Sequence, residues 1–392
     1  MDIIALLLEG FAIAFQPINL VVVVIGVIVG LFIGAMPGLG SVNGVAILLP
    51  MTFLVPPTSA IIFLAALYYG AMYGGAISSI MLGIPGASTA VATTFDGRPL
   101  ALKGQADKAL ITAAMASFIG GTISVLLFTG FAPPLAQIAL DFGDHEIFAL
   151  MLLAFATFVG LSGDDIPKTI FSICIGLVFS AVGLDIMSGE PRLVFFDIIG
   201  FMHGINFLVL AIGIYGIGEM MWTIESNRGD TTMSKAVLTI NGVLDSLREM
   251  GRTWFSWTTG SLLGFFVGIL PAAGATPGAL MAYGVAKMTS KESDNFGKGE
   301  IAGVVAPESA NNSASTGALL PMLTLGIPGS PTTAILLGGM VIWGLVPGPL
   351  LFVEEKEFVW GLIGSLYVAN LFALLINVAF IPIFLWVLKM PF

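Results

Sequence analysis

Two motifs that combine glycine and proline inside apolar sequence each occur twice in this chain. The segment Gly30–Gly40 (GLFIGAMPGLG) returns as Gly264–Gly274 (GFFVGILPAAG), with three glycines, a phenylalanine and the proline in register. The segment Gly83–Thr89 (GIPGAST) returns as Gly326–Thr332 (GIPGSPT). Proline removes a helical hydrogen bond and glycine lets the backbone unwind, so both motifs interrupt helices. The sequence therefore predicts two related halves, each with two interrupted helices.

The composition is that of a protein whose surface faces lipid. The chain is 57% hydrophobic and 10% charged, whereas about 25% of residues are charged in a typical soluble domain. Backbone groups in lipid must bond within their own segment, so apolar runs of about 20 residues predict membrane-spanning helices. The longest such runs are Ile18–Met36, Ala109–Phe131, Ile198–Met221 and Phe358–Leu388. We therefore expect an all-α polytopic membrane protein of about ten spans, besides broken or re-entrant segments.

The sequence lacks the signatures of the common enzyme classes. It contains no HExxH zinc motif, no GxSxG nucleophile elbow and no Walker loop. The histidines His145 and His203 do not have metal-ligand spacing, and the single cysteine, Cys174, lies in an apolar run. No basic face is present to neutralise phosphates, so nucleic acid is excluded as a partner. We expect no enzymatic activity, no cofactor and, because no basic n-region precedes a cleavage site, no removable signal peptide.

Basic residues orient the chain in the membrane. Of the 14 basic residues, ten fall in three loops, and the positive-inside rule places these loops in the cytoplasm. In the first half the basic loop follows the second motif, whereas in the second half it lies between the two motifs. Equivalent loops then face opposite sides, which predicts an inverted-topology repeat; a parallel duplication is the alternative. The basic loops contain Arg98, Lys103 and Lys108; Arg228, Lys235, Arg248 and Arg252; and Lys287, Lys291 and Lys298.

The motifs and loops divide the chain into segments. We expect a first repeat core at 1–108 with its motifs at 30–44 and 83–89, a four-helix scaffold at 109–222, a cytoplasmic linker at 223–252, a second repeat core at 253–350 and a C-terminal transmembrane segment at 351–392.

Polar residues gather at the predicted interruptions. Freed N–H groups at half-helix N-termini carry partial positive charge and favour an anion. Hydroxyls and amides can replace the hydration shell of a carboxylate, although any single Ser or Thr could instead hydrogen-bond between helices. The residues that we expect to bind substrate are Gly38, Gly40, Ser41, Asn43, Ser78, Gly86, Ser88, Thr89, Ala273, Gly274, Thr276, Asn311, Asn312, Gly329, Ser330 and Thr332.

A carboxylate adjoins the most polar of these segments. Glu308 lies past the last basic loop, where it could sit inside the membrane, and an intramembrane carboxylate is by default a functional candidate. We expect Glu308, Asn311 and Thr324 to hold a coupling cation, a sodium ion or a proton. The alternatives for Glu308 are an ion pair with Lys298 or stabilisation of a helix N-terminus. Asp96 is expected to organise a cytoplasmic turn.

These features predict a secondary transporter whose substrate site lies at interrupted helices near the bilayer midplane. A cation and a carboxylate would bind together, and the loaded state would move by alternating access. Two other classes remain open. An anion channel would line a continuous pore with the interruptions. A membrane enzyme or receptor scaffold would use them for packing only.

At these motifs the chain resembles the large membrane subunit (TctA) of the tripartite tricarboxylate transporters. The resemblance covers nearly the whole chain. The segments that carry it are Gly34–Gly40, Tyr73–Ser78, Gly83–Gly86, Phe95–Leu100, Pro271–Thr276, Ala306–Asn312 and Leu323–Gly329.

The resemblance implies a cation-coupled importer of a tricarboxylate or related organic acid in the cytoplasmic (inner) membrane of a prokaryote. It also implies a periplasmic solute-binding protein and a small membrane subunit as partners, with a stand-alone carrier as the alternative; a homo-oligomer is compatible with such a subunit. Family members usually continue further, so we expect this chain to be short at its C-terminus. No arginine lies in an interruption motif, so the sequence does not favour a tricarboxylate over a dicarboxylate.

Overall fold

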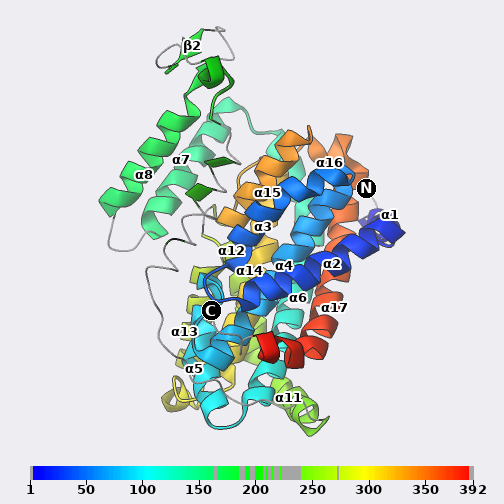
Figure 1. Cartoon of the computed structure of the whole chain (residues 1–392), viewed down its shortest axis with the longest axis vertical. Helices are drawn as coiled ribbons and strands as arrows, with labels where there is room; N and C mark the ends of the chain where they lie inside the picture. The colour runs from blue at the N-terminus through cyan, green and yellow to red at the C-terminus, as the bar shows by residue number, and fades with distance from the viewer. Residues whose placement is uncertain are drawn as a thin grey trace.

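The protein is almost entirely helical, as a computed structural model of the chain shows (Figure 1). The structure describes residues 3–161, 166–184, 190–194, 199–205, 209–210, 213–214, 221, 240–271 and 273–387. Within these ranges the only strands are β1 (Gly183–Leu184) and β2 (Pro191–Arg192), which pair antiparallel with Gly183 opposite Arg192. The predicted all-α class is therefore confirmed.

The helices follow one another with short connections. The first part of the chain forms α1 (Ile3–Ala14), α2 (Pro17–Ala35), α3 (Gly40–Leu48), η1 (Leu49–Leu54), α4 (Pro57–Leu82), η2 (Ser88–Ala90) and α5 (Val91–Leu102). The middle forms α6 (Ala106–Leu140), α7 (Asp144–Leu161), α8 (Ile166–Ser180) and η3 (Ile199–His203). The last part forms α11 (Ile240–Arg252), α12 (Trp254–Ile269), α13 (Ala275–Thr289), η5 (Ser293–Asn295), α14 (Ala302–Leu325), α15 (Pro331–Ile342), α16 (Leu351–Glu354) and α17 (Lys356–Val387).

Among the described residues, 4 helices are long and apolar enough to cross a membrane: α2, α4, α6 and α17. Three of them contain apolar runs that the sequence singled out, and α4 adds a further one. Half of the run Ile198–Met221 and all of the segment 222–239 lie outside the described residues. The boundaries of the expected scaffold and linker segments therefore stay predictions.

Glycine pairs let the helices at the centre approach closely. A Cβ atom at Gly30 would collide with the Leu67 carbonyl of α4. A Cβ atom at Gly34 would collide with the Ala71 carbonyl, one turn further along α4. In the second half, Cβ atoms at Gly264 and Gly268 would collide with carbonyls of α14 in the same way. Each half thus packs an interrupted helix against a long buried helix through glycines at equivalent positions.

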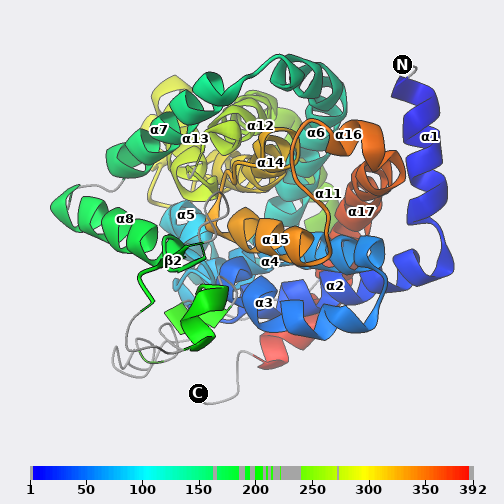
Figure 2. The same ribbon diagram turned by 90° about the horizontal axis from the view of Figure 1, so that it is seen from above.

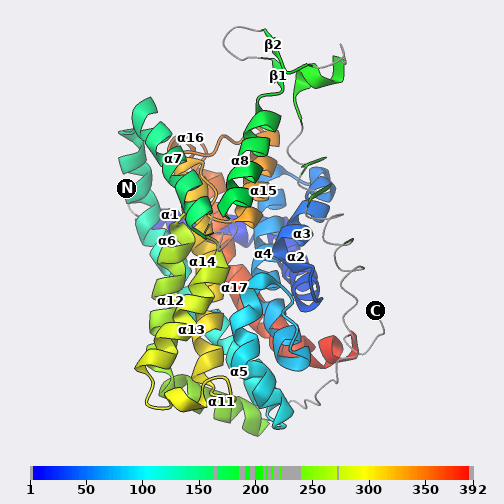
Figure 3. The same cartoon turned by 90° about the vertical axis from the view of Figure 1, so that its left-hand side faces the viewer.

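Each half places one of its helices toward each end of the molecule. In Figures 1 and 3, α3 and α15 lie in the upper part, whereas α5 and α13 run to the lower end beside α11. Seen from above, α1 and α17 lie together on one side, and α7 and α8 lie on the other (Figure 2).

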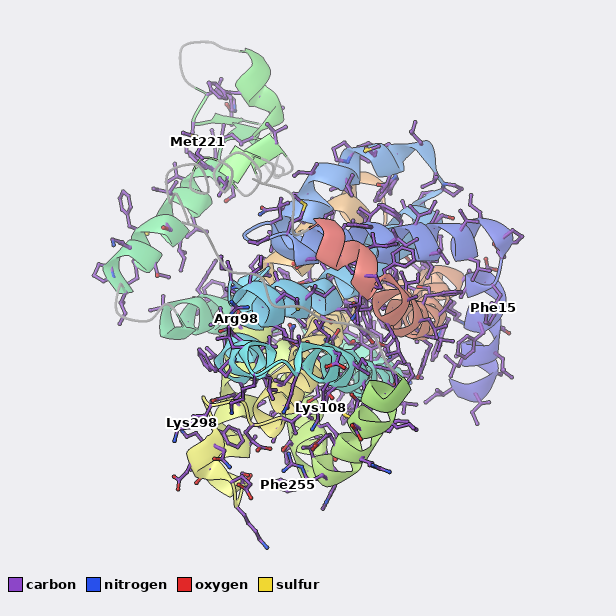
Figure 4. All side chains as sticks on the ribbon, turned by 60° about the horizontal axis from the view of Figure 1, so that its bottom comes forward. Phe15, Arg98, Lys108, Met221, Phe255 and Lys298 are labelled. Carbon is purple, nitrogen blue, oxygen red and sulfur yellow. The ribbon has the colours of Figure 1, made fainter. Side chains whose placement is uncertain are left out.

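The basic loops meet at the lower end. The Lys108 ammonium lies 2.6 Å from Glu249 of α11, and Arg252 bridges Glu249 and Glu300 at 2.7 and 2.8 Å. Figure 4 shows Arg98, Lys108 and Lys298 toward this end. The assignment of this end to the cytoplasm stays a prediction from the positive-inside rule.

Asp96 joins the two halves at this same end. Instead of lying in a turn of its own, it lies within α5 and binds the turn that precedes α14. Its Oδ1 accepts the N–H groups of Gly297, Gly299 and Glu300 at 2.9, 2.7 and 2.8 Å, and its Oδ2 accepts the Tyr283 hydroxyl at 2.9 Å. Asp96 thus organises a turn, but this turn lies in the second half and not in the segment that contains Asp96.

Replacing Gly30 with alanine tests the close packing of α2 on α4. The new Cβ has no room, so we expect Gly30→Ala to destabilise the fold by about 1–3 kcal/mol. Thermal unfolding of the purified protein in detergent measures this. Gly130→Ala on α6 is the matched control, because no atom lies within 4 Å of its new Cβ. Equal melting temperatures for the two variants would contradict the packing argument.

The ion pairs of Glu249 predict acid sensitivity at the lower end. Burial alone would raise the pKa of Glu249, but hydrogen bonds from Lys108 and Arg252 hold that pKa below its usual value. A lowered folded-state pKa stabilises the fold above the ordinary value of 4.5, and the contribution disappears as the pH falls through the folded-state pKa. We expect Glu249→Gln to lower the free energy of unfolding at neutral pH by at most about 1 kcal/mol, measured as a lower melting temperature, and to have no effect in strong acid. Glu357→Gln, at an exposed carboxylate, should change neither value.

Candidate functional site

The predicted interruptions are present in the first half. Helix α2 ends at Ala35 and α3 begins at Gly40, and the connection uses φ angles of +84° at Gly38 and +61° at Gly40. Helix α4 ends in a left-handed cap at Gly83, with φ +73°. Residues that have a side chain rarely adopt positive φ angles, so glycine is required at these positions.

The second half repeats these conformations at equivalent positions. Helix α12 ends at Ile269, and Gly274 leads into α13 with φ +64°. Helix α14 ends in a left-handed cap at Gly326, with φ +69°. Ser330 then begins α15 with a capping box, in which its side chain accepts the Thr333 N–H and its own N–H donates to the Thr333 hydroxyl.

The interruptions meet in space and are joined by hydrogen bonds. The Gly274 N–H donates to the Gly329 carbonyl at 2.9 Å, which links the two breaks of the second half. Between the halves, the hydroxyls of Ser41 and Thr332 lie 2.9 Å apart, and the Thr276 hydroxyl donates to the Ser88 hydroxyl at 3.3 Å. Four segments that are distant in the sequence thus enclose one space.

That space is a pocket of about 700 Å³. This volume falls in the range of small-molecule sites, which are roughly 300–1,000 Å³. Its walls are Gly38, Leu39, Gly40, Ser41, Val42, Asn43, Tyr68, Met72, Pro85, Ala87, Ser88, Thr89, Ala273, Gly274, Ala275, Thr276, Ser330, Pro331 and Thr332.

The pocket favours an anion without containing a cationic side chain. None of its lining residues is charged. Helices α3, α13 and α15 all begin at its wall, at Gly40, Ala275 and Pro331. The first N–H groups of a helix have no partner within the helix, and the helix dipole is positive at this end. Hydroxyl groups from both halves lie between these helix starts and can donate to the same ligand.

The structure brings most of the predicted substrate residues to this pocket and leaves a few behind its wall. Ser78, Gly86, Asn311, Asn312 and Gly329 are the predicted residues that do not line it. A Cβ at Gly86 would collide with the Gly34 carbonyl, so this glycine allows the two breaks of the first half to touch. The Ser78 hydroxyl donates to the Gly75 carbonyl of its own helix at 3.4 Å, while Asn311 and Asn312 are fully buried in α14.

Two large lining residues were not predicted from the sequence. Tyr68 and Met72 come from the middle of α4, one turn apart, and the Tyr68 hydroxyl lies 3.3 Å from the Ser330 hydroxyl. Both belong to an apolar run in which no glycine is combined with a proline, which is why the search for interruption motifs passed over them. Tyrosines at positions 68, 69 and 73 of this run were the signal that could have found them.

The expected cation residues do not form one cluster. Glu308 accepts hydrogen bonds from Thr93 and Ser117 and does not pair with Lys298. Thr324 follows Glu308 on α14 by 16 residues, about 24 Å along the helix axis, and its hydroxyl donates to the Leu320 carbonyl. Within the described part of the chain, no group of three or more His, Cys, Asp or Glu side chains could hold a metal ion.

A family model and two curated relatives match the chain. A curated relative from Agrobacterium vitis, "Uncharacterized 52.8 kDa protein in TAR-I ttuC' 3'region", is 36% identical over the whole chain and 77% of its own length. A second, "Uncharacterized protein in TAR-II ttuC' 3'region" from the same organism, is 36% identical over 129 residues, which are 33% of this chain and 53% of the relative. No solved structure matches the chain. The family model described as "Tripartite tricarboxylate transporter TctA family" matches residues 20–392. The chain therefore belongs to the tripartite tricarboxylate transporter TctA family, a family of membrane transport components.

Proposed function

We propose that this chain is the large membrane subunit of a binding-protein-dependent tripartite system and imports a carboxylate by cation-coupled alternating access. The observation that carries the proposal is the pocket at the four interruptions. It carries hydroxyl groups from both halves on its walls, has the volume of a small-molecule site, and lies where three helices begin.

A carboxylate suits the chemistry of the pocket walls. The hydroxyls of Ser41, Ser88, Thr276, Ser330 and Thr332 would donate to the substrate oxygens, together with the backbone N–H groups at the helix starts. Dipoles and hydroxyls bind a carboxylate more weakly than an arginine does, which suits a carrier that must release its substrate. The same walls accept acids with two or three carboxylates, so the substrate class is organic acids of this size.

An inverted-topology repeat would give the pocket access to each side in turn. The equivalent helices α3 and α13 lie toward opposite ends of the molecule (Figure 3), which supports this arrangement. The Ser41–Thr332 and Thr276–Ser88 contacts run between the halves. In this scheme they break and re-form as one half moves against the other.

The family also supports the proposed partners and location. Its description names a tripartite tricarboxylate transporter, which fits a solute-binding protein in the periplasm, a small membrane subunit and a site in the inner membrane of a prokaryote. A channel is the second reading of the same pocket, and it predicts passive conduction rather than accumulation.

Uptake into proteoliposomes tests the proposal. Purified protein, alone and together with its solute-binding protein and small subunit, is supplied with radiolabelled citrate, succinate or malate. Sodium and proton gradients are imposed separately. We expect saturable accumulation of at least one acid that collapses when the driving gradient is dissipated. Equilibration without accumulation under every gradient would favour a channel, and no movement of any organic acid would overturn the proposal.

A substitution at the pocket wall tests the placement of the substrate. Thr276→Val removes a hydroxyl at the start of α13 with little change in shape. Loss of one hydrogen bond to a charged ligand costs about 1.5–3 kcal/mol, so we expect the half-saturating substrate concentration to rise about 10- to 100-fold. Thr289→Val is the matched control, because Thr289 lies at the other end of the same helix and its hydroxyl donates to the Val285 carbonyl. If both variants transport like the unmodified protein, this wall does not contact substrate.

A further inference from the structure

Glu308 is a carboxylate at the centre of the protein, where three helices cross. It is 0% exposed and lies in the second turn of α14, against α5 and α6. The Thr93 hydroxyl of α5 donates to its Oε1 at 2.5 Å, and the Ser117 hydroxyl of α6 donates to its Oε2 at 3.0 Å. Each carboxylate oxygen thus has one hydroxyl partner.

No positive charge among the described residues compensates Glu308. None of their lysines, arginines or histidines lies within salt-bridge distance of it. Tyr73 of α4 lies within its electrostatic range, and α12 and α15 carry no acidic, basic, tyrosine or cysteine side chain. The remaining ionisable groups of the helices packed against α14 lie toward their ends or are already paired. These are Asp96 on α5, bound to backbone N–H groups and to Tyr283 of α13; Arg98 on α5, whose guanidinium donates to the Met81 carbonyl; Tyr68 and Tyr69 on α4, bonded to Ser330 and Thr316; Lys287 on α13; Asp107 and Lys108 on α6, of which Lys108 is paired with Glu249; and Glu354 at the end of α16.

An uncompensated carboxylate anion is costly at this depth, so Glu308 needs a bound cation in the resting protein. The hydroxyl partners suit a proton. A hydroxyl can donate to a carboxylate and can equally accept from a carboxylic acid, so Thr93 and Ser117 satisfy Glu308 in both states. The oxygen separation of 3.0 Å between Ser117 and Glu308 is that of a direct hydrogen bond, and the Thr93–Glu308 separation is shorter still.

Glu308 is linked to the pocket through the η2–α5 segment, which carries its hydrogen-bond partner Thr93. Thr89 lines the pocket, and Thr93 follows it by four residues, in the first turn of α5. Asn311, one turn after Glu308 on α14, is fully buried, and neither amide atom has a hydrogen-bond partner. Movement of the η2–α5 segment on substrate binding would therefore change the surroundings of Glu308 directly.

We propose that Glu308 is the proton-binding site of this protein and that the Thr93–Glu308–Ser117 contact couples substrate movement to a proton. The proposal rests on the proposed transport function and deepens it by naming the coupling ion. A proton from the outer solution bonds to a Glu308 oxygen before substrate binds, and the same O–H bond breaks when the loaded site faces the cytoplasm. The proton then leaves to the cytoplasmic water, so one proton crosses for each cycle of Glu308.

Infrared spectroscopy tests proton binding without any transport. We expect the purified protein at neutral pH to show the C=O stretch of a protonated carboxylic acid, shifted in D₂O and unchanged when sodium replaces potassium. Glu308→Gln should lack this band, and Glu357→Gln, at an exposed carboxylate, should keep it. Absence of the band from the unmodified protein, its persistence in Glu308→Gln, or its loss on adding sodium would overturn the proposal.

A second variant serves where Glu308→Gln does not fold. Ser117→Ala keeps the carboxylate and removes one partner, so the pH at which the band disappears should shift. If the band disappears at the same pH in Ser117→Ala and in the unmodified protein, the Ser117 hydroxyl does not act on a proton at Glu308, and the proposal is overturned.

Transport then separates this inference from the proposed function. In proteoliposomes loaded with a pH-sensitive dye, we expect citrate uptake by the unmodified protein to acidify the interior. Glu308→Gln should lose accumulation driven by a proton gradient but keep citrate exchange between the two sides. Failure of citrate or any other acid to move at all would count against the proposed function. Citrate accumulation with no acidification, driven by sodium alone, would leave transport standing and overturn the role of Glu308.

Discussion

Every backbone N–H and C=O group in a lipid-facing protein must find a partner inside the protein, and the rest of this structure depends on that constraint. Unwound backbone is tolerated at membrane depth only where it is packed in protein or lines a watery space. Here the Gly274–Gly329 hydrogen bond ties the two interruptions of the second half, and the Ser41–Thr332 and Thr276–Ser88 hydroxyl contacts tie them to the first half. The helix ends that remain unpaired surround one pocket. A single break would leave costly unpaired backbone groups, whereas the breaks together form a binding surface.

The long helices α4 and α14 make this arrangement rigid. Nearly all of α4 and all of Ala302–Thr324 are buried, although the latter segment contains many polar residues. Polar side chains on these helices bond across the centre, including Tyr73 with Asn370 at 2.6 Å and Ser124 with Thr316 at 2.8 Å. Hydrogen bonds of this kind fix the relative positions of helices that lipid alone would let slide.

The sequence predicted the helix breaks well because glycine and proline act locally, and the φ angles at Gly83 and Gly326 follow from residue type alone. It also predicted that polar residues at the breaks would gather. It did not place Tyr68 at the pocket, because a residue inside an unbroken helix is brought there only by the crossing of distant segments. Thr324 was grouped with Glu308 as a polar residue near the interruptions. Both residues lie on the continuous helix α14, and helix geometry keeps them apart.

Asp96 has a consequence for how this protein can move. It belongs to α5, yet three of its four hydrogen bonds reach backbone N–H groups of the turn before α14. At the lower end, the first half and the second half are therefore held together by a side chain outside the pocket. In the proposed transport cycle, opening the pocket toward that end would require these hydrogen bonds to break, whereas opening toward the other end would leave them intact. One carboxylate thus makes the two ends of the molecule mechanically unequal.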